Sequence, residues 1–193
     1  MPSWLALMAD RHAWRWAGLL LLLWAAIGAE SALHYQRSGF LAGAWWQPLS
    51  AQLMHLSAPH AAVNALVSWL LICWFGPQRL VFCGSALAVA IGLMLDPQCA
   101  YYAGASGALH GCLAGGALAQ LAQARGRDRY WSALLLVGLL TKLLLAFWFA
   151  GKGVNTAAWL GIAVYWPAHV WGSAGGGLTA LVLWRFKAFS AEK

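Results

Sequence analysis

A serine and a histidine stand in two apolar segments that lie far apart in this sequence. Ser106 belongs to the run GASG and His169 to the run AHVWG. Polar side chains are costly inside membrane-spanning helices unless they meet a partner or serve a function. A hydroxyl next to an imidazole is the nucleophile and base of covalent catalysis. We therefore predict a Ser–His dyad, with Ser106 as the nucleophile and His169 as its general base.

A second group of polar residues precedes this pair in the chain. His60 and Asn64 are four residues apart, so they share one face of a helix. Hydrogen bonding between helices is the alternative role, and it is worth only about 0.6 kcal/mol on average in membranes. Two donors on one face, beside a candidate nucleophile, favour a role in the site. His55 would point about 140° away from His60 if helical, and we expect it to anchor a loop.

Two further side chains leave alternatives open. His110 lies four residues after Ser106 on the same helical face, so it could modulate the site or replace His169 as the base. Lys142 lies within an apolar segment, and we expect it to extend outward or to face a wet cleft. The carboxylates Glu30, Asp96 and Asp128 fall in loops or at helix ends. The sequence thus favours a dyad without a third, acidic member.

Glycines recur at four-residue spacing in the segments that carry Ser106 and His169. Gly107 and Gly111 follow the serine, and Gly172 and Gly176 follow the histidine. Stripes of small residues let two membrane helices approach closely. We expect this approach to bring the two short side chains together.

The composition is that of an integral membrane protein. Of 193 residues, 62% are hydrophobic and 9% are charged, against roughly 25% charged in soluble domains. We predict one all-α domain over residues 1–193, a six-helix membrane bundle in a lipid bilayer. Its apolar segments span residues 13–29, 52–75, 80–95, 102–124, 131–150 and 159–184.

The net charge of +7 is arranged as in a membrane protein. Basic residues cluster in short connections between apolar runs, which argues against a nucleic-acid partner. If six helices alternate, one side carries Arg11, Arg15, Arg79, Arg125, Arg127, Arg129, Arg185 and Lys187, and the other carries Arg37 and Lys152. The positive-inside rule predicts a multi-pass protein of the plasma (inner) membrane, with both termini cytoplasmic and the site opening outward.

The first segment has a second interpretation. Basic residues, a short apolar run and the sequence AIGA before Glu30 also resemble a cleavable signal peptide.

The four cysteines form no CxxC pair, and we expect free thiols. We predict no metal ion and no cofactor.

The polar motifs together resemble the rhomboid family of intramembrane serine proteases. The resemblance extends over essentially the whole chain in three places. His55, His60 and Asn64 follow the family's H-x4-H-x3-N pattern, and Ser106 follows its G-x-S-G motif. The residues from Ala168 to Gly176 follow A-H-x-x-G-x-x-x-G. Each motif is weak alone, and their order and combination are specific.

The resemblance implies a role for each motif. It implies a serine endopeptidase that cleaves single-span membrane proteins in or beside their membrane segment. Ser106 and His169 would be catalytic. His60, Asn64 and the Ser106 backbone N–H would form the oxyanion hole, and the loss of one such donor costs about 10²–10³ in rate.

Two positions depart from the family pattern. Trp46 is followed by Gln47 where rhomboids often have arginine, and His110 stands where an aromatic residue often stacks on the base. The short chain and the serine motif are similar to the rhombosortase branch, which implies substrates with glycine-rich C-terminal tails. Two alternatives remain. One is an inactive rhomboid-like chaperone, and the other is a membrane protein whose histidines bind haem or a metal.

Overall fold

The computed structural model describes residues 11–27, 31–123, 125–149 and 164–191. The described part of the chain is mostly helical: 78% of it is helix, in eight α-helices, in agreement with the predicted all-α class. The longer helices are α2 (Arg11–Ile27), α5 (Ala58–Phe75), α6 (Arg79–Leu95), α7 (Ser106–Gln123), α8 (Arg127–Phe149) and α9 (Pro167–Ala191). The short elements are η1 (Ser31–Leu33), β1 (Tyr35–Gln36), α3 (Arg37–Leu41), α4 (Gln47–Ser50) and β2 (Tyr101–Tyr102).

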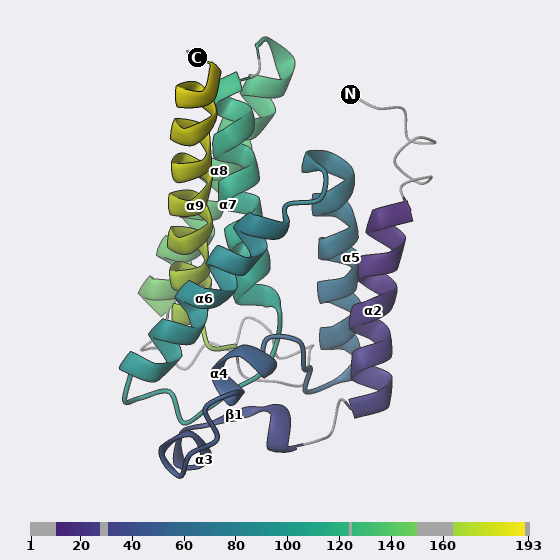
Figure 1. The fold of residues 1–193 in the computed structure, drawn as a ribbon, viewed down its shortest axis with the longest axis vertical. Coiled ribbons are helices and arrows are strands. Elements are labelled where there is room, and N and C mark those ends of the chain that lie inside the picture. The colour runs from purple at the N-terminus through teal and green to yellow at the C-terminus, as the bar shows by residue number, and fades with distance from the viewer. Residues whose placement is uncertain (1–10, 28–30, 124, 150–163, 192–193) are drawn as a thin grey trace.

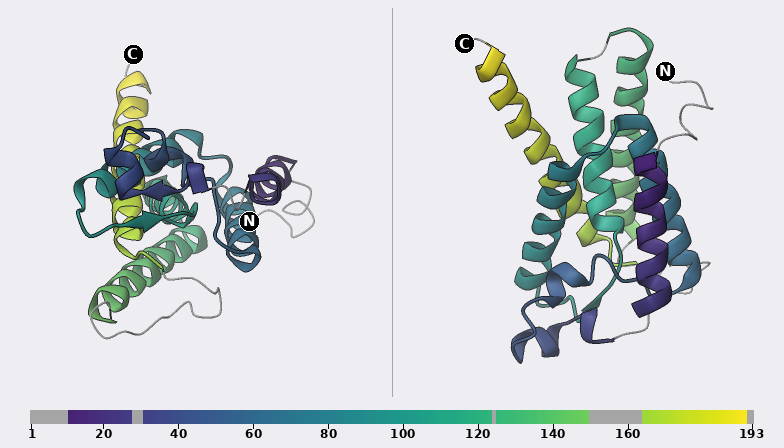
Figure 2. Two further views of the ribbon diagram at one scale, coloured as in Figure 1. Left: turned by 90° about the horizontal axis from the view of Figure 1, so that it is seen from below. Right: turned by 45° about the vertical axis from the view of Figure 1, so that its right-hand side comes forward.

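The long helices run side by side, and the short elements gather at one end of them (Figure 1). Helix α9 packs most extensively on α7 and then on α6, while α8 packs on α7 and α2 packs on α5. The start of α2, the α5–α6 and α7–α8 connections and the end of α9 lie at the opposite end from the short elements (Figure 1). Helix α9 is inclined to α7, so its C-terminal end stands apart from the bundle (Figure 2).

Helices α5 and α8 are long and apolar enough to cross a membrane, judged by length and composition within the described residues. Within the described residues, helix α8 packs mainly on α7. Its exposed apolar side chains include Leu134, Val137, Leu140, Leu144 and Phe147. An apolar stripe of this extent has no favourable contact with water.

The second helix begins later than we predicted from the sequence. The predicted segment 52–75 divides into a turn and helix α5, which starts at Ala58. Ser57 caps the helix by accepting a hydrogen bond from the backbone N–H of His60 at 3.3 Å, and Pro59 occupies its first turn. Both are favoured at a helix N-terminus. The helical placement of His55 was therefore wrong, since this residue lies in the loop before α5.

The helices that carry Ser106 and His169 also begin later than predicted. Helix α7 starts at Ser106 rather than near residue 102, because Tyr101–Tyr102 forms strand β2. Helix α9 starts at Pro167, although the segment was predicted from residue 159, and it continues to Ala191. Residues 159–163 lie outside the described residues. Ser106 therefore opens its helix, and His169 lies in the first turn of the other.

The remaining predicted boundaries differ from the structure by a few residues. Helix α2 covers Arg11–Ile27 where 13–29 was predicted, and residues 28–29 lie outside the described part. Helix α6 begins at Arg79, one residue before the prediction. Helix α8 begins at Arg127, four residues before it, and residues 124 and 150 lie outside the described part.

The short elements form a layer across one end of the bundle. Strands β1 and β2 are antiparallel, with Tyr35 opposite Tyr102. Arg37 donates a hydrogen bond to the carbonyl of Asp96 at 2.8 Å, and the buried Tyr35 hydroxyl donates one to the carbonyl of Leu93 at 2.9 Å. These donors satisfy carbonyls at the C-terminal end of α6, which have no partner within that helix. The layer thereby fixes the strand from which the chain enters α7.

Candidate active site

Ser106 and His169 meet at the layer end of the bundle. The Ser106 Oγ lies 3.0 Å from the His169 Nε2, within hydrogen-bonding distance. His169 is buried, and Ser106 is partly buried. The hydroxyl also stands at the N-terminus of α7, where the helix dipole and the backbone N–H groups of the first turn favour negative charge. The pair has the geometry that a serine needs to lose its proton to an imidazole.

The turn before Ser106 requires glycine at position 104. Gly104 has a φ of +131°, a conformation that L side chains rarely adopt. A Cβ at this position would also lie 2.5 Å from Cε1 of the His60 ring. The backbone N–H of Gly104 donates to the Ala51 carbonyl at 2.9 Å. The first glycine of the GASG run thus allows both the turn and the close approach of His60.

Glycines bring α7 and α9 into backbone contact. A Cβ on Gly172 would overlap the backbone carbonyl of Gly107, and a Cβ on Gly176 would overlap that of Gly111. On the other side of the contact, a Cβ on Gly115 would lie 2.7 Å from the Gly176 carbonyl oxygen. The two stripes therefore interlock along a line that begins at the dyad. Side chains as short as serine and histidine can meet across two helices only at such a separation.

A polar contact holds the start of α9 against the end of α6. The Tyr165 hydroxyl donates a hydrogen bond to the Asp96 carboxylate. This bond lowers the pKa of Asp96, and burial together with the same bond raises the pKa of Tyr165. The backbone carbonyl of Tyr165 also accepts a hydrogen bond from the backbone N–H of Ala168 at 3.3 Å. Nothing in the sequence singled out this pair, because its two members are 69 positions apart.

His60 and Asn64 both lie buried on α5. Their side-chain atoms His60 Nδ1 and Asn64 Nδ2 have no hydrogen-bond partner among the described residues. An unsatisfied buried donor is costly, roughly 1–3 kcal/mol. The His60 ring lies against Gly104, two residues before Ser106, so it borders the turn that leads into α7. A buried amide donor without a partner, such as Asn64 Nδ2, suits a site where negative charge develops during a reaction.

His110 stacks on His169 rather than competing with it for the serine hydroxyl. The two rings are 4.0 Å apart and inclined by 10°. The His110 Nδ1 lies 2.6 Å from the backbone carbonyl of Ser106, and its Nε2 contacts the Lys142 Nζ. Lys142 Nζ also lies 3.4 Å from the His169 Nδ1. Lys142 therefore faces the site, a contact that we did not expect from its sequence position.

His55 lies in the loop before α5 and is completely buried. Its ring packs edge to face against His60, with ring centres 5.0 Å apart. Burial lowers the pKa of His55 to about 4, and the neighbouring His60 ring contributes to this to a lesser degree. His55 is therefore neutral at pH 7 and supports the His60 ring from the side of the layer.

Gln47, one of the two departures from the rhomboid pattern, belongs to the layer. It is buried, its Oε1 accepts the backbone N–H of Gln36 at 3.0 Å, and its Nε2 donates to the Ala32 carbonyl. The amide joins the start of α4 to strand β1. Gln47 thus has a structural role in the layer that borders the site.

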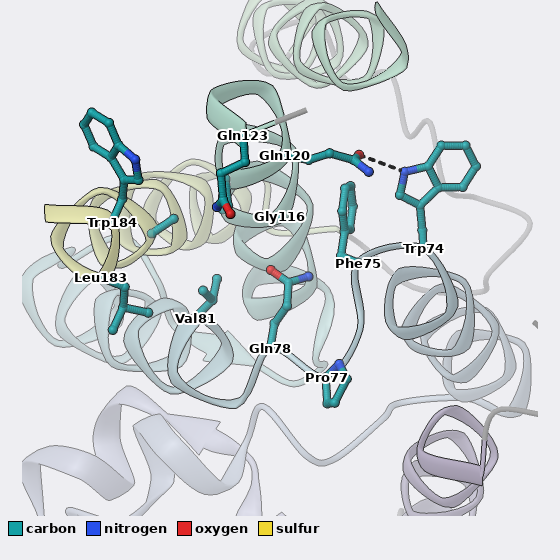
Figure 3. A pocket seen from close by; sticks show the side chains of 13 residues that line it. Trp74, Phe75, Pro77, Gln78, Val81, Gly116, Gln120, Gln123, Leu183 and Trp184 are labelled. Atoms are coloured by element: carbon teal, nitrogen blue, oxygen red, sulfur yellow. Dashed lines mark hydrogen bonds between the residues drawn. The ribbon is translucent and has the colours of Figure 1, made fainter. Parts of the chain in front are cut away.

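Two hollows lie away from the dyad. A cavity of about 520 Å³ opens where α9 diverges from α7, between Phe75, Gln78, Gly116 and Leu183 (Figure 3). Gly116 is ten residues from Ser106, or about 15 Å along the helix. A second hollow of about 560 Å³ lies between α6 and α9, along Gly92 and Trp171. Neither is lined by the dyad.

Among the described residues, no group of three or more His, Cys, Asp or Glu side chains is placed to hold a metal ion. The cysteines Cys73, Cys83, Cys99 and Cys112 are free thiols, of which Cys99 and Cys112 are buried. No family model matches the sequence, and no curated protein matches it.

Proposed function

We propose that this chain is an intramembrane serine endopeptidase of the rhomboid type. Ser106 attacks the carbonyl carbon of a substrate peptide bond while His169 takes the hydroxyl proton. The acyl-enzyme forms as the amine product leaves with a proton from His169. Water, activated by the same imidazole, then releases the acyl group.

One observation carries this proposal. The Ser106 Oγ and the His169 Nε2 lie 3.0 Å apart, although they come from segments 63 positions apart. The alternative base, His110, directs its Nδ1 to the Ser106 carbonyl and not to the hydroxyl. We therefore assign the base to His169.

The oxyanion hole is proposed from the buried donors of α5. Asn64 Nδ2 is a donor without a partner among the described residues, and His60 lies against the turn at Gly104. Together with the backbone N–H of Ser106, they would bind the negative oxygen of the tetrahedral intermediate. The N-terminus of α7 adds a favourable dipole at the same place.

We propose that the bundle crosses the membrane six times, through α2, α5, α6, α7, α8 and α9. The connections rich in arginine then lie at one end, and the layer with the dyad lies at the other. The positive-inside rule places the arginine end in the cytoplasm and the dyad near the outer face. Fusions of a reporter that fluoresces only in the cytoplasm would test this. Fluorescence of a fusion at the C-terminus and at position 126 is expected, and its absence at both would overturn the orientation.

Labelling by a serine-reactive fluorophosphonate tests the catalytic assignment. We expect the wild type to be labelled and Ser106→Ala to be unlabelled. His169→Ala should lose at least about 10⁴-fold in labelling rate, since a dyad acts as a unit. Ser132→Ala is the matched control, because this buried hydroxyl lies in α8 and bonds Gln120 at 2.7 Å. Labelling that persists in Ser106→Ala would refute the proposal.

The substrate class is proposed from the resemblance to rhombosortases. Substrates would be single-span proteins with a glycine-rich C-terminal tail, because glycine eases the unwinding that exposes a helical carbonyl. Co-expression with such a protein should release its outer domain. Cleavage of a generic transmembrane substrate without release of the glycine-tailed one would reject the rhombosortase assignment and retain the protease. The chaperone alternative predicts no labelling, and the haem alternative predicts a visible absorption band.

A further inference from the structure

Lys142 lies on the Nδ1 side of His169, the place that the acidic member of a catalytic triad would occupy. It comes from α8, seven residues before Phe149, or about 10 Å from the end of that helix. An ionisable side chain at such depth in a membrane helix is costly and points to a function with a definable partner. Its Nζ contacts the His110 Nε2 and lies 3.4 Å from the His169 Nδ1, at the long end of hydrogen-bonding distance.

The donors and acceptors in this cluster decide which ring nitrogen of each histidine carries the proton. The Ser106 carbonyl only accepts, so the His110 Nδ1, 2.6 Å away, carries a proton. The His110 Nε2 of the neutral ring is then an acceptor, and Lys142 must donate to it. For His169 to accept the serine proton on Nε2, its own proton must sit on Nδ1. That N–H faces Lys142.

An ammonium and an amine have opposite effects on His169. An ammonium has three donors and no acceptor, so it would hold the His169 proton on Nε2, where the ring cannot accept from Ser106. A neutral amine offers a lone pair to the Nδ1–H and still donates to His110. A continuous ring of hydrogen bonds then runs from the Ser106 hydroxyl through His169, Lys142 and His110 to the Ser106 carbonyl.

We propose that Lys142, as a neutral amine, is the positioning residue that fixes the reactive tautomer of His169. It does so by accepting a hydrogen bond from the His169 Nδ1–H while it donates one to the His110 Nε2. This inference rests on the proposed function, since it concerns the same dyad. The titratable groups that face Lys142 among the described residues are His110 of α7 and His169 of α9, and His60 of α5 in turn faces His169. A proton added to the Lys142–His110 pair breaks the ring and switches the site off.

Three substitutions at position 142 separate this role from a simple charge effect. Lys142→Gln keeps one acceptor and one donor without a titrating group. It should retain activity within about tenfold. It should also lack the rise of kcat/KM with pH, between about pH 6 and pH 10, that the proposal predicts for the wild type. Lys142→Arg offers donors only and should lose about 10²–10⁴-fold in kcat, the scale of a wrong tautomer in a serine protease. Lys142→Met, which removes both roles, should fall between them.

The order of the variants decides the outcome. If Arg retains more activity than Gln, or if all three variants keep the pH profile of the wild type, the proposal is wrong. Because Lys142 is exposed, we expect all three variants to fold.

A measurement independent of catalysis reads the tautomer itself. ¹⁵N NMR of the His169 imidazole in detergent, assigned by loss of its signals in His169→Asn, should show the proton on Nδ1 in the wild type at high pH and in Lys142→Gln. In Lys142→Arg it should show the proton on Nε2. This pattern in a wild type without peptidase activity would refute the proposed function and support the tautomer role. Peptidase activity with the same His169 tautomer in all variants would support the proposed function and refute the tautomer role of Lys142.

Discussion

Gly172→Ala should separate the dyad without touching either of its members. The added methyl carbon would lie 2.5 Å from the backbone carbonyl carbon of Gly107, and neither backbone can yield by a rotamer change. Carbon atoms in contact normally lie about 3.5–4.0 Å apart, so α9 must withdraw from α7 by about 1 Å at this level. His169 lies three residues away on the same helix. The Ser106–His169 distance of 3.0 Å would then approach about 4 Å, beyond a hydrogen bond.

The expected cost is larger for catalysis than for stability. Overpacking typically costs about 1–3 kcal/mol of stability, whereas loss of general-base contact costs about 10²–10⁴ in rate. Gly176→Ala meets the Gly111 carbonyl in the same way one turn further on. It should destabilise similarly but reduce activity less, because it is further from the dyad.

The assay measures peptide release and fluorophosphonate labelling together with thermal unfolding in detergent. Gly177→Ala is the matched control on the same helix, since its methyl would meet only the Leu118 Cδ1 at 3.3 Å, the end of a flexible side chain. Wild-type activity in Gly172→Ala would refute the argument that the glycine contact sets the dyad distance. Equal losses of activity in Gly172→Ala and Gly177→Ala would refute it as well.

Three further predictions concern the turn and the donors around the serine. Asn64→Ala should lower kcat by about 10²–10³ with little change in KM, as for loss of one oxyanion donor, and a change confined to KM would contradict this. Gly104→Ala should abolish activity and lower the melting temperature, because the methyl is strained at φ +131° and meets the His60 ring; unaltered activity would contradict the geometry of the turn. His55 has a folded-state pKa of about 4 against an ordinary 6.5, so stability should be full above pH 6.5 and fall by up to about 1.4 kcal/mol per pH unit as the pH drops toward 4. Unfolding measured against pH should show this fall in the wild type and less of it in His55→Gln.

The sequence allowed us to predict the chemical groups of the candidate site but not their positions along the helices. Ser106 and His169 were placed inside their helices because hydropathy marks where a segment is apolar and not where its backbone becomes helical. Strand pairing by Tyr102 and the positive φ of Gly104 delay the start of α7. The cap at Ser57 likewise removes His55 from α5. Each of these depends on local hydrogen bonds or on partners elsewhere in the chain.

The glycine stripes show where sequence reasoning is strong. Four-residue spacing on two helices has one physical consequence, a face without side chains, and α7 and α9 pack on those faces. The Tyr165–Asp96 contact shows where it is weak, since nothing in either residue's neighbourhood names its partner.

By itself, the sequence determined a helical chain with a hydroxyl, an imidazole and two small-residue stripes at fixed spacing, because periodicity and composition are local properties. Only the tertiary structure decided that Ser106 and His169 lie within a hydrogen bond, that His110 stacks on the imidazole and that Lys142 reaches both rings. These contacts join α7, α8 and α9. Their geometry depends on how closely the three helix backbones approach, which spacing along one chain does not specify.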